Sequence, residues 1–144
     1  MIIISACLCA RACRYNGTSC PNAEALALLK AGKALPVCPE MLGGLKTPRS
    51  PAEIVGGNGA DVLAGKAFVR NRQGDNVTAA FIRGAEEVLR LCKLHGVTLA
   101  LLKSNSPSCG CGQIYDGLFS GHLIPGNGIT AELLISHGIE VKAL

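Results

Sequence analysis

The chain has 144 residues, 49% of them hydrophobic, which is the size and composition of one globular domain and excludes a disordered chain. Its net charge of +4 is modest, aromatic residues make up 3% and Trp is absent, so the composition argues against a polynucleotide partner and suits a small anion or free nucleobase. No apolar run reaches the roughly 18 residues of a membrane-spanning helix, and the first residues lack the basic region of a signal peptide. We therefore expect a cytoplasmic protein with a single domain over residues 1–144.

Short apolar strands alternate with helical segments along the chain. In chain order, the pattern predicts a strand at residues 2–5, a helix at 21–31, strands at 35–37 and 67–69, a helix at 78–95, a strand at 98–102, a helix at 130–137 and a strand at 140–142. Residues 41–65 are rich in glycine, have no clean period and are expected to form a long loop. The alternation favours an α/β fold: a three-layer, Rossmann-like domain with a mainly parallel sheet and helices on both faces.

Three of the eight cysteines follow predicted strands. Cys7, Cys38 and Cys109 come after the strands at 2–5, 35–37 and 98–102, and parallel strands end at one edge of a sheet, where ligands bind. In a cytosolic chain, cysteines at such places indicate metal or redox chemistry more than disulfides. The alternative is that they are small buried residues at strand ends. The chain lacks the Cys-x2-Cys pairs that are typical of zinc sites.

Iron–sulfur clusters are held by thiolates, and glycine-rich loops supply backbone N–H groups to cluster sulfur. Three ligands would leave one iron open to substrate, as catalytic zinc sites keep one open position. Cys13 competes with Cys7 for the first ligand position or joins it. Four ligands would make a closed cluster, typical of a non-catalytic iron–sulfur protein or redox sensor. The roles of Cys9 and Cys111 stay open.

Polar residues accompany these cysteines. Glu40, two residues after Cys38, is placed to act as a general base, or it is a helix-capping or solvated carboxylate. Ser106, three residues before Cys109, is placed to hold a water, or it belongs to a Ser-Pro-Ser turn. Arg49 lies between two prolines, an extended setting that suits presentation of a guanidinium to an anion or carbonyl; the alternative is a surface arginine paired with Glu53.

Together these motifs resemble the TudS-like thiouracil desulfurase family over nearly the whole chain. The resemblance is carried by Ser5-Ala6-Cys7-Leu8, Cys13-Arg14-Tyr15-Asn16-Gly17, Cys38-Pro39-Glu40, Leu42-Gly43-Gly44-Leu45-Lys46-Thr47-Pro48-Arg49, Gly56-Gly57-Asn58-Gly59, Ser104-Asn105-Ser106-Pro107-Ser108-Cys109-Gly110 and Tyr115-Asp116-Gly117-Leu118-Phe119. It implies a cytosolic enzyme that removes sulfur from a small thiolated nucleobase without net redox change. The implied cofactor is a [4Fe-4S] cluster with one iron free to bind substrate sulfur.

Carried onto this sequence, the resemblance implies Cys7, Cys38 and Cys109 as the cluster ligands. Glu40 and Ser106 are the implied catalytic pair, which handles water and proton transfer. We expect Arg49, Asn105 and Ser108 to bind the substrate. A plain binding module with reduced thiols and no metal is the remaining alternative, and it differs in iron and acid-labile sulfide content.

Overall fold

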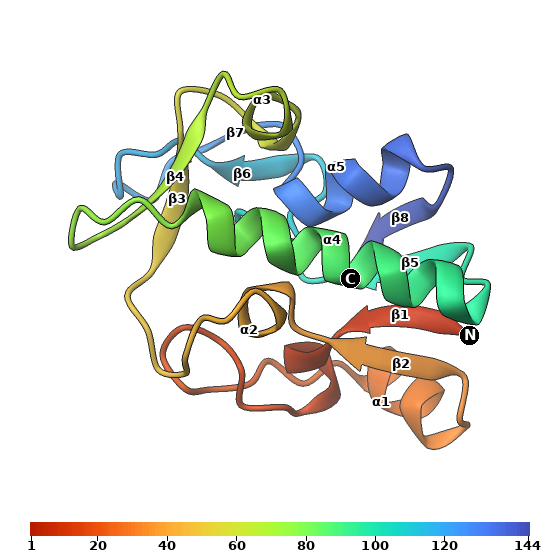
Figure 1. Ribbon diagram of the computed structural model, residues 1–144. Helices are drawn as coiled ribbons and strands as arrows, with labels where there is room; N and C mark the ends of the chain where they lie inside the picture. Colours follow the sequence, from red (N-terminus) through yellow and green to blue (C-terminus); the bar gives the residue numbers. More distant parts are fainter.

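The computed structural model describes all residues from 1 to 144 and is built around one parallel sheet. Its strands are β1 (Ile2–Ser5), β2 (Ala34–Val37), β5 (Leu99–Leu102) and β8 (Glu140–Ala143), in the order β2-β1-β5-β8. Every neighbouring pair is parallel (Figure 1). The central strands β1 and β5 are buried, because helices cover both faces of a parallel sheet.

Helices form a layer on each side of the sheet. α4 (Thr78–His95) and α5 (Ile129–Ser136) pack on one face, whereas α1 (Ala23–Lys30) and the short 3-10 helix η1 (Ala6–Cys9) pack on the other. Neighbouring residues of β1 divide between the two cores: Ile3 packs with α4 and α5, and Ile4 with α1 and η1. The predicted three-layer α/β fold is therefore confirmed. None of its helices has the length and apolarity needed to cross a membrane.

The long predicted helices and the sheet strands are confirmed with small shifts. The helix at 78–95 has the predicted bounds, and the one at 130–137 begins one residue earlier. The helix at 21–31 is shorter because Asn22 is its N-cap, with a side chain that accepts a hydrogen bond from the backbone N–H of Ala25.

The expected parallel strand at 67–69 is placed differently. β4 (Phe68–Asn71) pairs antiparallel with β3 (Ala52–Val55) in a separate two-stranded sheet, which the sequence pattern did not indicate. The prediction of a long loop at 41–65 was also wrong, because this segment contains the end of α2 (Pro39–Leu42), all of β3, and α3 (Gly59–Leu63). These elements are too short to show a period, but a capping box between Asn58 and Asp61 fixes the start of α3.

A second small sheet completes the domain. β6 (Gln113–Tyr115) and β7 (Leu123–Pro125) form an antiparallel hairpin that was not predicted. Both small sheets pack on the start of α4 and α5 through one apolar cluster, which includes Ile54, Val69, Phe81, Ile114 and Ile129. They lie beyond the carboxyl ends of the central strands (Figure 1), where they add a wall to the site described next.

Candidate active site

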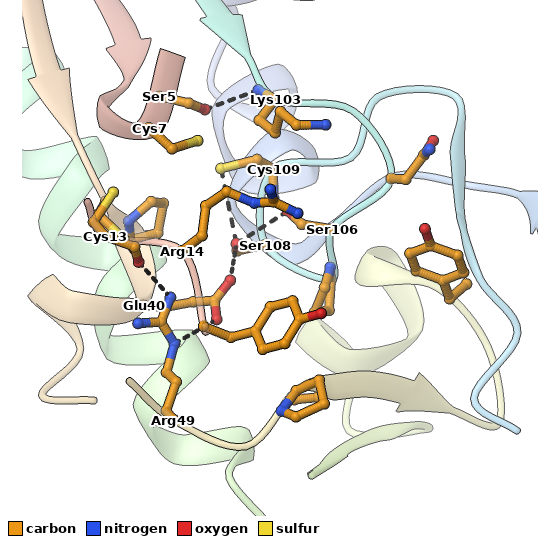
Figure 2. Close-up of a pocket in the computed structure, with 18 of the residues that line it drawn as sticks. Ser5, Cys7, Cys13, Arg14, Glu40, Arg49, Lys103, Ser106, Ser108 and Cys109 are labelled. Atoms are coloured by element: carbon orange, nitrogen blue, oxygen red, sulfur yellow. Dashed lines mark hydrogen bonds and ion pairs between the residues drawn. The ribbon is translucent and has the colours of Figure 1, made fainter. Parts of the chain in front are cut away.

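A cavity of about 360 Å³ lies at the carboxyl ends of β1, β2 and β5. Its floor comes from the loops that leave these three strands, because the carboxyl ends of parallel strands meet at one edge. Its opposite wall comes from the segments around β3, β4 and the β6–β7 hairpin (Figure 2). All of the predicted site residues line it: Cys7, Cys38, Glu40, Arg49, Asn105, Ser106, Ser108 and Cys109.

The structure brings the three predicted cysteines together and adds Cys13. Cys7 lies in η1 directly after β1, Cys38 follows β2 as the N-cap of α2, and Cys109 lies in the loop after β5. Cys13 packs with Cys7 in one buried cluster against which Cys38 lies, and the Cys38 thiol donates to the Cys13 carbonyl at 3.8 Å. Cys7, Cys13 and Cys109 are buried, so this is a recessed thiol cluster (Figure 2).

The surroundings of these thiols shift their pKa values in different directions. The neighbouring Cys13 thiol lowers the pKa of Cys7. The Cys13 thiol, together with burial, raises the pKa of Cys38 far above its ordinary range. Burial raises the pKa of Cys109 to about 12, although the hydroxyls of Ser5 and Ser108 act in the opposite direction. In the metal-free protein, therefore, Cys38 and Cys109 are neutral thiols at pH 7, and a metal that binds them displaces protons.

Glu40 ends a chain of polar side chains that runs to the Cys109 loop. The Ser108 hydroxyl donates to Glu40 Oε2 at 2.9 Å, and the hydroxyl oxygens of Ser106 and Ser108 lie 3.3 Å apart. Ser106 Oγ also accepts the backbone N–H of Cys109 at 2.8 Å. The sequence placed Ser106 and Glu40 near their cysteines, and the structure connects them through Ser108 (Figure 2).

The loop that carries Cys109 is fixed by the start of α5. The first N–H groups of a helix have no partner within the helix; here those of Ile129 and Thr130 donate to the carbonyls of Pro107 and Ser108 at 2.8 and 2.9 Å. Gly128 allows this approach, because a Cβ there would stand 2.6 Å from the Ser108 carbonyl carbon. Asn105 has a left-handed backbone with φ of 71°, which asparagine tolerates better than most residues.

Arg49 lines the cavity but pairs within the protein. Its Nε donates to Glu40 Oε1 at 3.1 Å, and its side chain is only 9% exposed. The alternative pairing with Glu53 is not formed. The buried Glu53 carboxylate instead accepts the backbone N–H groups of Gly117 and Phe119 at 2.9 and 3.2 Å.

Sequence reasoning missed the opposite wall of the cavity. Both tyrosines of the chain and one of its three phenylalanines line the cavity, with Arg14, Arg72 and Lys103. Of these residues, Arg72, Tyr115 and Phe119 belong to the opposite wall. Phe119 has a left-handed backbone with φ of 55°, and the guanidinium of Arg72 lies 5.5 Å from the centre of its ring. The scarcity of aromatic residues was an available signal, because most of those present gather at this one site.

Three comparisons place this geometry among known proteins. A family model for 2-thiouracil desulfurase matches residues 2–143. The chain is 46% identical over 141 residues to an uncharacterized Bacillus subtilis (strain 168) protein, YbbK, covering 98% of this chain and 93% of that protein. It is also 46% identical to a solved structure of a [4Fe-4S]-dependent thiouracil desulfidase, TudS, with a TM-score of 0.86 over 99% of this chain and 89% of the other. The protein described here belongs to the 2-thiouracil desulfurase family.

Proposed function

We propose that this protein is an enzyme that hydrolytically removes sulfur from a small thiolated nucleobase, with a [4Fe-4S] cluster held by Cys7, Cys38 and Cys109. The observation that carries the proposal is the convergence of three strand-end thiols and a Glu40–Ser108–Ser106 chain on one cavity. The family match and the [4Fe-4S]-dependent TudS neighbour support the same activity and cofactor. The reaction replaces a thiocarbonyl sulfur with a water oxygen, releases hydrogen sulfide and transfers no electrons.

The donor set suits an iron–sulfur cluster. Four thiols, of Cys7, Cys13, Cys38 and Cys109, line the cavity, and thiolates are the usual ligands of such clusters. No three Cys, His, Asp or Glu side chains come together closely enough to hold a single metal ion. A cluster has a larger core than one ion, so thiols that line a cavity without closing on one point fit it better. When bound through three cysteines, the cluster supplies a Lewis-acidic iron with affinity for thiocarbonyl sulfur.

The hydrogen bonds give the polar chain a direction. Because Ser108 donates its hydroxyl proton to Glu40 Oε2, its oxygen is free to accept the hydroxyl proton of Ser106. Ser106 Oγ already accepts from the backbone N–H of Cys109, and its remaining lone pair can accept a proton from a water molecule in the cavity.

Proton transfer follows the same direction. As the water attacks the thiolated ring carbon, its proton passes to Ser106, the Ser106 proton to Ser108, and the Ser108 proton to Glu40 Oε2. Glu40 is therefore the general base, and the two hydroxyls orient the water and relay its proton. Glu40 then returns this proton to the sulfur, so the carboxylate is regenerated and the C–S bond breaks to release hydrosulfide. The second water proton, still on the new oxygen of the ring carbon, passes to the hydrosulfide, which gives the carbonyl product and hydrogen sulfide.

The aromatic side chains that line the cavity suit a flat heteroaromatic ring. Phe119, Tyr15 and Tyr115 provide aromatic faces, and a nucleobase stacks on such faces whatever its substituents. Asn105, which directly precedes Ser106 in the chain, also lines the cavity and is proposed to bind the nucleobase through its side-chain amide. Ser108 is assigned to the relay more than to substrate binding, because its hydroxyl is committed to Glu40.

A four-cysteine cluster in a redox sensor is the second candidate, because Cys13 contacts both Cys7 and Cys38. Cys13→Ser separates the two proposals. A three-ligand enzyme keeps its cluster and its activity after this substitution. If Cys13 is instead a fourth ligand, Cys13→Ser should lower the iron content, or should leave one iron without a protein ligand that the wild-type cluster has.

The activity is tested by anaerobic reconstitution of the protein, followed by assay of hydrogen sulfide released from thiouracil. Glu40→Gln and Ser106→Ala are each expected to lower kcat by about 10²–10⁴-fold while the cluster is retained. Glu87→Gln, which alters an exposed carboxylate on α4, is the control and should leave kcat unchanged. Cluster-loaded wild-type protein that releases no sulfide from thiolated pyrimidines would refute the proposed function.

A further inference from the structure

Arg49 ties together three segments of the site through its side chain. Its Nε donates to Glu40 Oε1 at 3.1 Å, its Nη2 to the Cys13 carbonyl at 2.9 Å, and its Nη1 to Thr47 Oγ1 at 2.9 Å. These partners belong to the first turn of α2, to the loop after η1 and to the loop of Arg49 itself. Each guanidinium nitrogen therefore has a partner within the protein, in a side chain that is only 9% exposed.

The backbone of Arg49 adds a second tie to the same loop. Its N–H donates to the Tyr15 carbonyl at 2.6 Å, two residues after the carbonyl that its side chain binds. The segment from Cys13 to Tyr15 is thus held at both ends by one residue. The three nitrogens of the guanidinium are therefore already bound to protein groups in the absence of substrate.

The two oxygens of Glu40 are held by different partners. Arg49 binds Oε1 and Ser108 binds Oε2, so the carboxylate plane is fixed with Oε2 directed along the serine chain (Figure 2). A glutamate has three rotatable side-chain bonds, and free rotation would turn Oε2 away from Ser108 for part of the time. A misplacement of about 1 Å in a reacting group can cost about 100-fold in rate.

We propose that Arg49 is a positioning residue, which acts on the reaction through Glu40 by fixing its carboxylate, and that it does not bind the substrate. This inference rests on the proposed function, since it assigns Glu40 the role of base. It replaces the sequence-based expectation that Arg49 meets the substrate. A lysine cannot reproduce the arrangement, because an ammonium lacks the planar fork that reaches Glu40, Cys13 and Thr47 together.

The test is a double-mutant cycle with Arg49→Met, Glu40→Gln and the double variant, all loaded anaerobically. We expect Arg49→Met to lower kcat about 100-fold in the wild-type background, with KM for thiouracil changed less than about threefold. In the Glu40→Gln background the same change should lower kcat less than about threefold, because a residue that acts through Glu40 has nothing left to position. Arg90→Met, which breaks an exposed Arg–Glu pair on α4, is the matched control.

Two further readouts keep the proposal open to refutation. Iron per chain should be unchanged in Arg49→Lys and Arg49→Met, and melting of the cluster-free proteins should show Arg49 and Glu40 coupled by non-additive shifts in Tm. If Arg49→Met does not fold, Arg49→Lys enters the same cycle. Additive losses of kcat, or an increase confined to KM, would overturn the inference. A wild-type enzyme that releases no sulfide would instead overturn the proposed function and leave the Tm coupling to be judged separately.

Discussion

Gly84 in α4 sets the position of α2, and its replacement by alanine should therefore impair catalysis from outside the cavity. A Cβ at Gly84 would stand 2.7 Å from the Pro39 carbonyl carbon and closer to its oxygen. Carbon atoms in contact rest about 3.5–4.0 Å apart, so the segment with Pro39 must move by roughly 1 Å. Pro39 lies between Cys38 and Glu40, and both would move with it.

The expected loss follows from that displacement. Overpacking costs about 1–3 kcal/mol of stability, partly offset by up to about 1 kcal/mol from the better helix propensity of alanine. A 1 Å shift of Glu40, the proposed general base, is expected to cost about 100-fold in kcat. Thermal unfolding, iron content and sulfide release from thiouracil measure these three effects. The control is Glu86→Ala, a solvent-facing change on the same helix. A Gly84→Ala enzyme with wild-type kcat and iron content would refute the reasoning.

Three further predictions concern the relay, the aromatic wall and the core. Ser108→Ala interrupts the hydrogen bond to Glu40 Oε2 and should lower kcat by about 100-fold with little change in KM; a KM effect alone would argue for substrate binding. Phe119→Ala should raise KM for thiouracil by about tenfold, whereas Phe68→Ala, outside the cavity, should not. Burial raises the pKa of Cys92 to about 11 from an ordinary 9.0. The neutral thiol therefore stabilises the fold fully below pH 9, and this contribution is lost between pH 9 and 11. The free energy of unfolding of the reduced, cluster-free protein should fall between pH 8 and 10 by about 1 kcal/mol more than that of Cys92→Ala. An equal fall in both proteins would contradict the assignment.

The central sheet could be predicted because its information is local. Ile3 and Ile4 of β1 are buried on opposite faces of the sheet, and such continuous apolar runs are typical of interior parallel strands. The strand near residue 69 shows the limit of this reasoning. Val69 is fully buried, as Ile3 is, but it lies in the separate antiparallel sheet of β3 and β4. Its pairing partner is chosen by long-range packing that a short apolar run does not encode.

The site likewise has features that could be predicted from the sequence and features that could not. Strand ends and short motifs located the thiols, Glu40 and Ser106, because parallel topology carries adjacent strand ends to one edge. The partner of Arg49 was not predictable from spacing, since Glu40 and Glu53 were both near in sequence. The fold resolves the choice by engaging Glu53 with backbone N–H groups of the β6–β7 hairpin, whose position depends on contacts across the whole domain.

The most direct test of the account is iron and acid-labile sulfide analysis of protein kept from air, for the wild type and for Cys7→Ser, Cys38→Ser and Cys109→Ser. The account predicts about four iron and four sulfide per chain in the wild type, and a large loss of both, together with loss of sulfide release from thiouracil, in each variant. Cys92→Ser, a change in the core away from the cavity, should keep the cluster. A wild-type protein without iron, or serine variants that keep a full cluster, would contradict the claim that these three thiols hold it.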